Sequence, residues 1–196
     1  MVDKNIGDKL LLQVMIFSTR PGRVGLPIGQ WAFEQALTDE RFDVELIDLK
    51  EINLPFFDEP NHPRFGNYEH DHTKKWSDLV KKADAYIFVV PEYNFGYSAV
   101  FKNAIDFLHS EWYYKPVAFV SYGGVSGGTR AVQMIKQIVT TVKMMPIFES
   151  IYIPFVTNFI KDDKFIPVQE HLDTFILMMD EIFKVGTSFK DLRGSN

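Results

Sequence analysis

Short apolar runs alternate with helical patterns along the chain. Strands are expected at residues 10–17, 42–49, 86–90, 116–121 and 146–153, and apolar residues recur at helical spacing in 22–38, 72–83, 98–110, 131–142 and 172–186. The run 86–90 carries no charge, which is typical of a strand buried on both faces of a parallel sheet. Because parallel neighbours need crossover connections, the alternation predicts an α/β three-layer sandwich with helices on both faces of the sheet.

The strand order 2-1-3-4-5 is the economical arrangement for a five-stranded parallel sheet of this kind. The first and third strands are then neighbours, at the point where the strand order reverses. Three strand-to-helix bends meet there, and we call them the first bend (residues 18–25), the second bend (91–98) and the third bend (122–129). Ligands of open α/β sheets bind at this edge, so the three bends form the predicted binding site.

Composition narrows the possible functions. The length of 196 residues suits a single domain, which is predicted to span residues 1–196. The chain contains no cysteine, so disulfides, thiolate metal ligands and thiol catalysis are excluded, and any redox chemistry must come from a bound cofactor. A net charge of -5 offers no attraction to nucleic acid or to an anionic membrane. No apolar run is long enough to cross a bilayer, and the polar N-terminus does not fit a signal peptide, so a cytoplasmic protein is expected.

The first bend has the composition of an anion site. Ser18, Thr19, Arg20 and Arg23 supply two hydroxyl groups and two guanidinium groups just before a helix, whose free N–H groups already favour an anion. Neither the Walker spacing nor G-x-G-x-x-G is present, which leaves the phosphate of a mononucleotide. In the alternative interpretation, the two hydroxyl groups only cap the helix and both arginines are solvated.

The second and third bends have the composition expected around a planar heterocycle. Tyr93 and Phe95 offer flat apolar surface, and Asn94 and Ser98 offer polar side chains. Gly96, Gly123 and Gly124 allow the backbone to approach a ring closely. The alternative is ordinary turn chemistry, since Asn, Gly and Ser occur in any turn.

Three segments together carry a resemblance to a known family. They are residues 18–23 with Trp31 after them, residues 91–96 followed by 101–106, and residues 121–124. With these motifs the chain resembles the NAD(P)H-dependent FMN reductase family, which also contains quinone and azo-compound reductases, over nearly its whole length. The resemblance implies a flavodoxin-like fold, FMN as the cofactor, and NADPH or NADH as the reductant.

The resemblance also assigns cofactor-binding residues. In the family, the positions that match the first bend hold the FMN phosphate, and those that match the other two bends surround the isoalloxazine ring. The implied residues are Ser18, Arg20, Arg23, Val24 and Gly25 at the phosphate, and Pro91, Glu92, Tyr93, Asn94, Phe95, Gly96, Tyr122, Gly123 and Gly124 at the ring, with Ser121 beside them.

The implied reaction needs few protein acids or bases. Hydride passes from the nicotinamide to flavin N5, and an acceptor then replaces the nicotinamide and receives the electrons. Backbone N–H groups near Gly123 and Gly124 are expected to stabilise negative charge on the reduced ring, so no catalytic side chain is predicted. No metal site is predicted either, because the segment His70-Asp71-His72 is better explained as the solvated start of a helix.

The expected partners are a small-molecule electron acceptor and a second copy of the chain. Family members are commonly dimers, so the resemblance favours a homodimer, or a tetramer, that uses the aromatic stretch 109–114 and the proline-rich loop 50–67. A flavodoxin-type electron carrier without its own NAD(P)H oxidation is the alternative function, and the arginines of the first bend count against it. A phosphoacceptor receiver module would need acidic residues where the chain has Ser18, Thr19 and Arg20.

Overall fold

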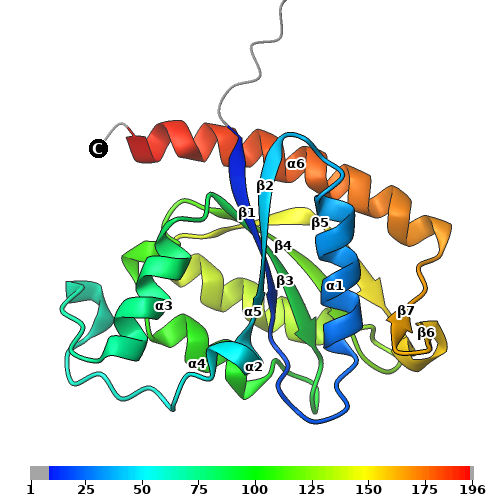
Figure 1. Cartoon of the computed structure of the whole chain (residues 1–196), viewed down its shortest axis with the longest axis horizontal. Coiled ribbons are helices and arrows are strands. Elements are labelled where there is room, and N and C mark those ends of the chain that lie inside the picture. Colours follow the sequence, from blue (N-terminus) through cyan, green and yellow to red (C-terminus); the bar gives the residue numbers. More distant parts are fainter. Residues whose placement is uncertain (1–8, 195–196) are drawn as a thin grey trace, which may run out of the picture.

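The computed structural model describes residues 9–194, which fold around a five-stranded sheet (Figure 1). The strands are β1 (Leu10–Ile16), β2 (Phe42–Asp48), β3 (Ala85–Pro91), β4 (Pro116–Tyr122) and β5 (Met145–Ile153). They follow the order β2-β1-β3-β4-β5, and each neighbouring pair is parallel. The predicted flavodoxin-like α/β fold and its strand order 2-1-3-4-5 are confirmed.

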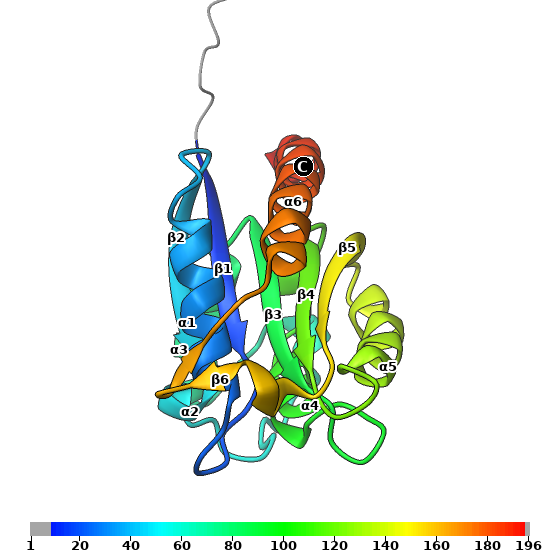
Figure 2. The same ribbon diagram turned by 90° about the vertical axis from the view of Figure 1, so that its right-hand side faces the viewer.

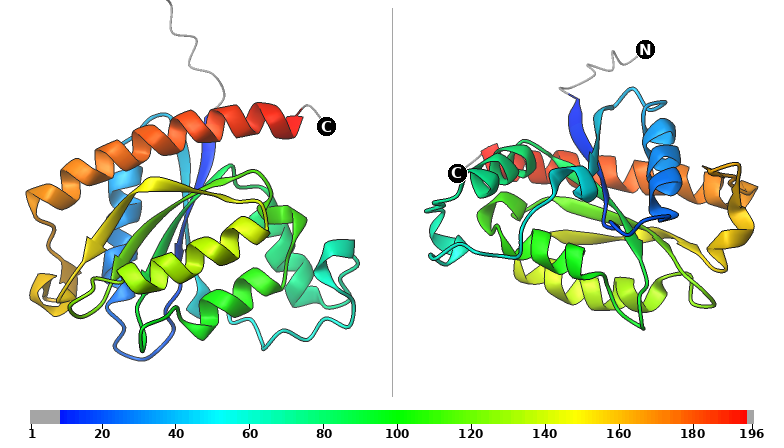
Figure 3. Two further views of the ribbon diagram at one scale, coloured as in Figure 1. Left: turned by 180° about the vertical axis from the view of Figure 1, so that it is seen from behind. Right: turned by 60° about the horizontal axis from the view of Figure 1, so that its bottom comes forward.

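Helices cover both faces of the sheet. One face carries α1 (Gly25–Ala36) and α6 (Gln169–Gly194), and the other carries α3 (Asp71–Lys81), α4 (Ala99–Asp106) and α5 (Thr129–Thr141), as the view from behind shows (Figure 3, left). Shorter elements are α2 (Leu49–Ile52), the 3-10 turns Pro63–Phe65, Ser110–Trp112 and Val156–Phe159, and a hairpin of β6 (Ile160–Lys161) and β7 (Lys164–Phe165). Every residue of β3 and β4 is buried, which explains why both strands are apolar on both faces.

The last helix crosses the starts of the strands, far from the bends at their carboxyl ends (Figures 1 and 2). The sequence pattern places the end of this helix at Gly186, and that prediction is wrong, since α6 continues to Gly194. A Cβ atom on residue 186 would lie only 2.7 Å from Cδ1 of Leu10. The glycine therefore lets α6 pack closely on the start of β1 and does not end the helix.

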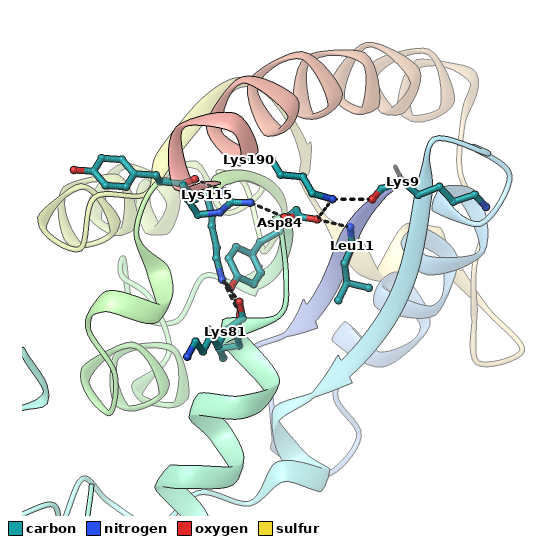
Figure 4. A network of polar contacts seen from close by, with 10 residues as sticks. Lys9, Leu11, Lys81, Asp84, Lys115 and Lys190 are labelled. Atoms are coloured by element: carbon teal, nitrogen blue, oxygen red, sulfur yellow. Dashed lines mark hydrogen bonds and ion pairs between the residues drawn. The ribbon is translucent and has the colours of Figure 1, made fainter. Parts of the chain in front are cut away.

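A polar network joins α6 to the starts of the strands (Figure 4). The carboxylate of Asp84 accepts hydrogen bonds from the N–H of Leu11 (3.0 Å) and from Nη2 of Arg193 (2.5 Å). The same carboxylate pairs with Nζ of Lys190 at 3.3 Å. These contacts hold the C-terminal helix at the end of the sheet opposite to the three bends.

Lys115 makes the stability of the fold depend on pH. Its amino group is buried and donates hydrogen bonds to the carbonyl groups of Val80 (2.9 Å) and Lys81 (3.0 Å) at the end of α3 (Figure 4). Burial lowers the pKa of Lys115 from 10.5 to about 7. Between these two values the unfolded chain binds more protons than the folded one, so the free energy of unfolding should rise with pH in this range.

The comparison with Lys115→Met isolates this contribution. Between pH 7 and pH 9, the wild type should gain about 1 kcal/mol or more of unfolding free energy relative to the variant, as measured by urea denaturation. A difference between the two proteins that stays constant over this range would show that the buried amine does not titrate there.

Candidate cofactor site

The carboxyl ends of β1, β3 and β4 lie side by side, and the three bends that follow them meet at this edge of the sheet (Figure 3, right). The N–H of Glu92 in the second bend donates to the carbonyl of Tyr122 in the third (2.9 Å). The hydroxyl of Ser98 donates to the carbonyl of Phe17 (2.8 Å) and accepts the N–H of Phe101 (3.2 Å). Ser98 therefore ties the second bend to the end of the first strand and caps α4, and its side chain is already engaged.

The first bend leaves several donors without a protein partner. Ser18 is fully buried, and its hydroxyl has no hydrogen-bond partner within the described part of the chain. Val24 precedes α1 without capping it by a side chain, and the first turn of the helix carries no acidic residue. Arg20 is exposed and forms no ion pair with any residue between 9 and 194. An uncapped helix N-terminus with a free cation beside it favours an anion, and the interpretation of Ser18 as the helix cap is wrong.

Arg23 of the same bend is engaged with the protein. Its side chain is only 6% exposed, and it donates to the carbonyl of Ser18 and to both carboxylate oxygens of Asp48 at the end of β2, with Nη1 2.6 Å from Oδ1. This bidentate ion pair balances the charge of Arg23 and ties the first bend to the edge strand. Of the two arginines in the bend, Arg20 is thus the one with an available charge.

The hydroxyl of Tyr122 also lies at the first bend. Tyr122 ends β4 and is 4% exposed, and its Oη has no hydrogen-bond partner among residues 9–194. A Cβ atom on Gly25 would lie 2.3 Å from Oγ of Ser18 and 2.3 Å from Oη of Tyr122. Two buried, unpartnered hydroxyl groups therefore converge on the first residue of α1, and residue 25 must be glycine to leave room for them.

The second bend holds a strained backbone. Reciprocal hydrogen bonds between the backbones of Tyr93 and Gly96 (2.9 and 3.0 Å) close a tight turn. Its two central residues, Asn94 (φ 48°) and Phe95 (φ 78°), both lie in the left-handed region. For a bulky residue such as Phe95 this conformation costs about 1 kcal/mol or more, and such strain is concentrated at functional sites. The ring of Phe95 is 66% exposed, so burial of its own side chain does not compensate for the strain.

The start of α5 braces the second bend. The carboxylate of Glu92 accepts the N–H of Arg130 (3.2 Å) and its Nη1 (3.0 Å). The guanidinium carbon of Arg130 lies 4.1 Å from the centre of the Phe95 ring. The side chain of Glu92, which is predicted at the ring of the cofactor, is thus hydrogen-bonded to α5. Arg130 holds the strained turn in place through its contact with the Phe95 ring. Arg130 is not among the predicted site residues, although it lies in the first turn of a helix directly after the glycine-rich third bend.

The third bend is held by Ser121 and by a second pair of glycines. The hydroxyl of Ser121 in β4 donates to the carbonyl of Gly127 (2.9 Å), so it ties the third bend to the end of the strand. Gly128 has φ 90°, and a Cβ atom there would lie 2.6 Å from Cβ of Ser121. The N–H of Gly123 donates to the carbonyl of Ile153 (3.3 Å), so this donor is already engaged within the protein. Gly127 and Gly128 belong to the site's framework and were not among the predicted residues.

A cavity of about 480 Å³ adjoins the first bend. Its lining is mostly apolar and comes from Thr19 of the first bend, from residues 49–56 and from the first turns of α4. Asn103 of α4 fixes the outer wall, since its Nδ2 donates to the carbonyl of Pro55 (2.7 Å) and its Oδ1 accepts the N–H of Phe57 (2.9 Å). Residues 50 and 53–56 of the proline-rich loop 50–67 therefore form a wall of this cavity.

The His70-Asp71-His72 segment lies at the start of α3, away from the bends. The two histidine rings stack with their centres 5.2 Å apart, and Nε2 of His72 lies 2.9 Å from Oδ1 of Asp58. Within residues 9–194, no three His, Cys, Asp or Glu side chains are grouped as a metal site would require. Across the same range, no helix combines the length and the apolar character needed to cross a membrane.

Comparison with known proteins places the chain in a family. The model of the family described as NADPH-dependent FMN reductase matches residues 13–158. An NAD(P)H-dependent FMN reductase of Schizosaccharomyces pombe is 42% identical over 123 residues, which cover 62% of this chain and 62% of that protein. An NAD(P)H-dependent FMN reductase of a Nectria species is 31% identical over 150 residues, 74% of this chain and 75% of that protein. The chain thus spans about three-fifths of the first relative and three-quarters of the second.

Solved structures agree on the fold. FerB, a flavoenzyme NAD(P)H:(acceptor) oxidoreductase from Paracoccus denitrificans, is similar with a TM-score of 0.69 at 21% identity, covering 92% of this chain and 98% of that one. A flavodoxin from the domain Archaea is similar with a TM-score of 0.56 at 15% identity, covering 90% and 99% of the two chains. The family model covers the first, second and third bends, and on this evidence the chain belongs to the NADPH-dependent FMN reductase family.

Proposed function

We propose that the protein is an oxidoreductase that holds FMN, takes electrons from NADPH or NADH and passes them to a small-molecule acceptor such as a quinone, an azo compound or a free flavin. One observation carries this proposal. At the first bend, two buried hydroxyl groups without partners in the described chain lie beside an uncapped helix N-terminus and the unpaired Arg20. Such a donor set suits a phosphate group, and membership of the family supports FMN as the molecule that carries it.

The first bend would hold the phosphate of FMN. The hydroxyl of Ser18, the guanidinium of Arg20 and the backbone at Val24 and Gly25 supply the donors, with Arg23 shaping the bend through Asp48. Each hydrogen bond to a charged phosphate contributes about 1.5 to 3 kcal/mol, so a few of them suffice for a firmly bound mononucleotide.

The second and third bends would hold the isoalloxazine ring. Pro91 to Gly96 supply the flat surface of Tyr93 and Phe95, and Tyr122 to Gly124 supply backbone on the other side. The brace from Arg130 and the bond from Ser121 fix both bends before any ligand arrives, which lowers the ordering cost of binding. FMN, when bound, supplies the two-electron chemistry, and the chain's residues bind and orient it.

The cavity beside Thr19 is our candidate for the binding site of the electron acceptor. Leu49, Leu54 and Phe56 give it apolar walls, and Asn53 and Asn103 add a few polar groups. This mixture suits a ring with polar substituents, as a quinone has.

We also propose a homodimer, which could assemble further into a tetramer, and a cytoplasmic location. Three phenylalanines of the loop 50–67 support the dimer, since Phe56, Phe57 and Phe65 are 86%, 41% and 59% exposed and a second copy would cover them. NADPH and NADH are both available as reductants in the cytoplasm, which is compatible with this location.

The test is reconstitution with FMN followed by turnover. The purified protein should be yellow or become yellow with added FMN, and it should oxidise NADPH or NADH in the presence of a quinone, an azo dye or free flavin. Colourless protein that takes up no FMN would sink the proposal. Bound FMN that dithionite reduces but neither nicotinamide reduces would identify a flavodoxin-type electron carrier instead.

A further inference from the structure

We propose that the hydroxyl of Tyr122 belongs to the phosphate end of the site and makes flavin binding depend on the phosphate group. This inference rests on the proposed function and extends it. The resemblance places Tyr122 at the isoalloxazine ring, whereas the structure directs its side chain to the opposite end. Tyr122 then distinguishes FMN from riboflavin.

The course of the side chain is the first argument. Tyr122 is the last residue of β4 and stands in register with Pro91 of β3. Its ring belongs to the apolar cluster on the α1 side of the sheet. Its Oη reaches the first bend, because a Cβ atom on Gly25 would come within 2.3 Å of it. The backbone of Tyr122 thus lies at the third bend while its hydroxyl lies at the first.

The unused hydrogen-bonding capacity is the second argument. The hydroxyl groups of Tyr122 and Ser18 lie together at the start of α1, where the Ser18 hydroxyl opposes part of the rise in the pKa of Tyr122, and neither reaches full hydrogen-bond geometry with any residue from 9 to 194. A buried hydroxyl without a partner destabilises a folded protein, and two of them at one point indicate atoms that a ligand supplies. The oxygens of a phosphate can accept from both hydroxyl groups and from the N–H groups of the first helical turn.

The protonation of Tyr122 is the third argument. Burial raises the pKa of the Tyr122 hydroxyl, and the nearby Ser18 hydroxyl and the charges of Arg20 and Arg23 oppose only part of this rise. The phenol therefore stays protonated at neutral pH and can donate its proton to a phosphate oxygen. A neutral donor next to Arg20 also leaves the positive charge of the bend intact for an anion.

Access to the two hydroxyl groups requires a movement of the first bend. Both oxygen atoms are sealed from solvent. The outer residues Arg20, Pro21 and Gly22 are exposed, and a Cβ atom on Gly22 would meet no atom within 4 Å. This part of the bend packs against little and can move outwards as the phosphate enters.

Binding of three flavins that differ in the length of their side chain tests the assignment. The protein is the full chain from which bound flavin has been removed. Titrations of the wild type and Tyr122→Phe would use FMN, riboflavin, which lacks the phosphate, and lumiflavin, which lacks the phosphate and the sugar chain. We expect the dissociation constant of FMN to rise about tenfold in the variant while those of riboflavin and lumiflavin stay unchanged. Equal weakening of FMN and riboflavin would assign the hydroxyl to the sugar chain, and weakening of all three would return it to the ring. Either result overturns the proposal.

Tyr152→Phe is the matched control. Tyr152 stands next to Ser121 in register on β5, and its ring packs with the cluster on the opposite face of the sheet. It should leave all three dissociation constants unchanged. Phosphate-selective weakening in this control as well would show that loss of any tyrosine hydroxyl near the sheet has the effect, which would remove the assignment from Tyr122.

Thermal unfolding separates a ligand role from a structural one. Tyr122→Phe should raise the Tm of the flavin-free protein, because it removes a buried hydroxyl without a partner, and it should reduce the further rise that FMN produces. A lower Tm without flavin together with an unchanged FMN dissociation constant would make the hydroxyl part of the fold. A wild type that binds no flavin would overturn the proposed function as well, whereas FMN binding that is equal in both proteins would overturn this inference alone.

Discussion

Replacement of Gly25 by alanine should strongly weaken FMN binding and destabilise the fold. The new Cβ atom would lie 2.3 Å from Oγ of Ser18 and 2.3 Å from Oη of Tyr122. Both side chains are buried, so neither oxygen can move away without disturbing the core or the first bend. We expect the free energy of unfolding to fall by about 1 to 3 kcal/mol and the dissociation constant of FMN to rise by at least about 100-fold. Urea denaturation and fluorescence titration measure the two effects.

Gly124→Ala is the control for the stability part of this prediction. A Cβ atom on residue 124 would meet no atom within 4 Å, so the same chemical change should leave the free energy of unfolding within about 0.5 kcal/mol of the wild type. Equal losses of stability in the two variants would show that the crowding at Gly25 is not the cause.

Removal of the Arg20 side chain should weaken FMN binding by about 10-fold to 100-fold. Arg20 carries the charge of the first bend that no partner among the described residues balances, whereas Arg23 is paired with Asp48. Loss of one or more hydrogen bonds to a charged phosphate corresponds to about 1.5 to 3 kcal/mol. The dissociation constant of FMN for the wild type should also rise with salt, and that of Arg20→Ala should respond less, because the salt-sensitive contact is gone.

Arg20→Lys separates charge from geometry. Lysine keeps the positive charge but lacks the planar fork of guanidinium donors, so its affinity for FMN should fall between those of the wild type and Arg20→Ala. Dissociation constants that agree across all three proteins at low salt would place the phosphate elsewhere.

The fold could be predicted because the residues of β3 and β4 are mostly apolar, which indicates strands that are buried on both faces. Strands covered by helices on both faces are mostly apolar along their length, and such strands alternate with helices in a doubly wound sheet. The end of α6 could not be predicted in the same way. A glycine at position 186 is typical of a helix end, but in the structure it provides space for the side chain of Leu10, which lies near the other end of the chain. Local propensity has no access to such a contact.

The meeting of the three bends at one edge of the sheet could also be predicted, but the direction of their side chains could not. The strand order 2-1-3-4-5 is enough to place the ends of β1, β3 and β4 side by side. The pairing of Arg23 with Asp48 depends on β2 lying beside β1, and the brace between Arg130 and Glu92 depends on α5 starting beside β3. Tyr122 crosses from one bend to another because its ring fills the core beside α1. Each of these contacts is set by tertiary packing, which the spacing of residues along the chain does not specify.

The amide of Asn103 anchors the part of the proline-rich loop that both lines the cavity and exposes Phe56. It holds residues 55 and 57 against α4 by hydrogen bonds, so the wall of the proposed acceptor cavity and the exposed ring of Phe56 belong to one short anchored span. A second copy of the chain that packs on the ring of Phe56 would also contact this wall of the cavity. With the proposed dimer and the proposed acceptor site, a substitution in this span should change self-association and the choice of oxidant together.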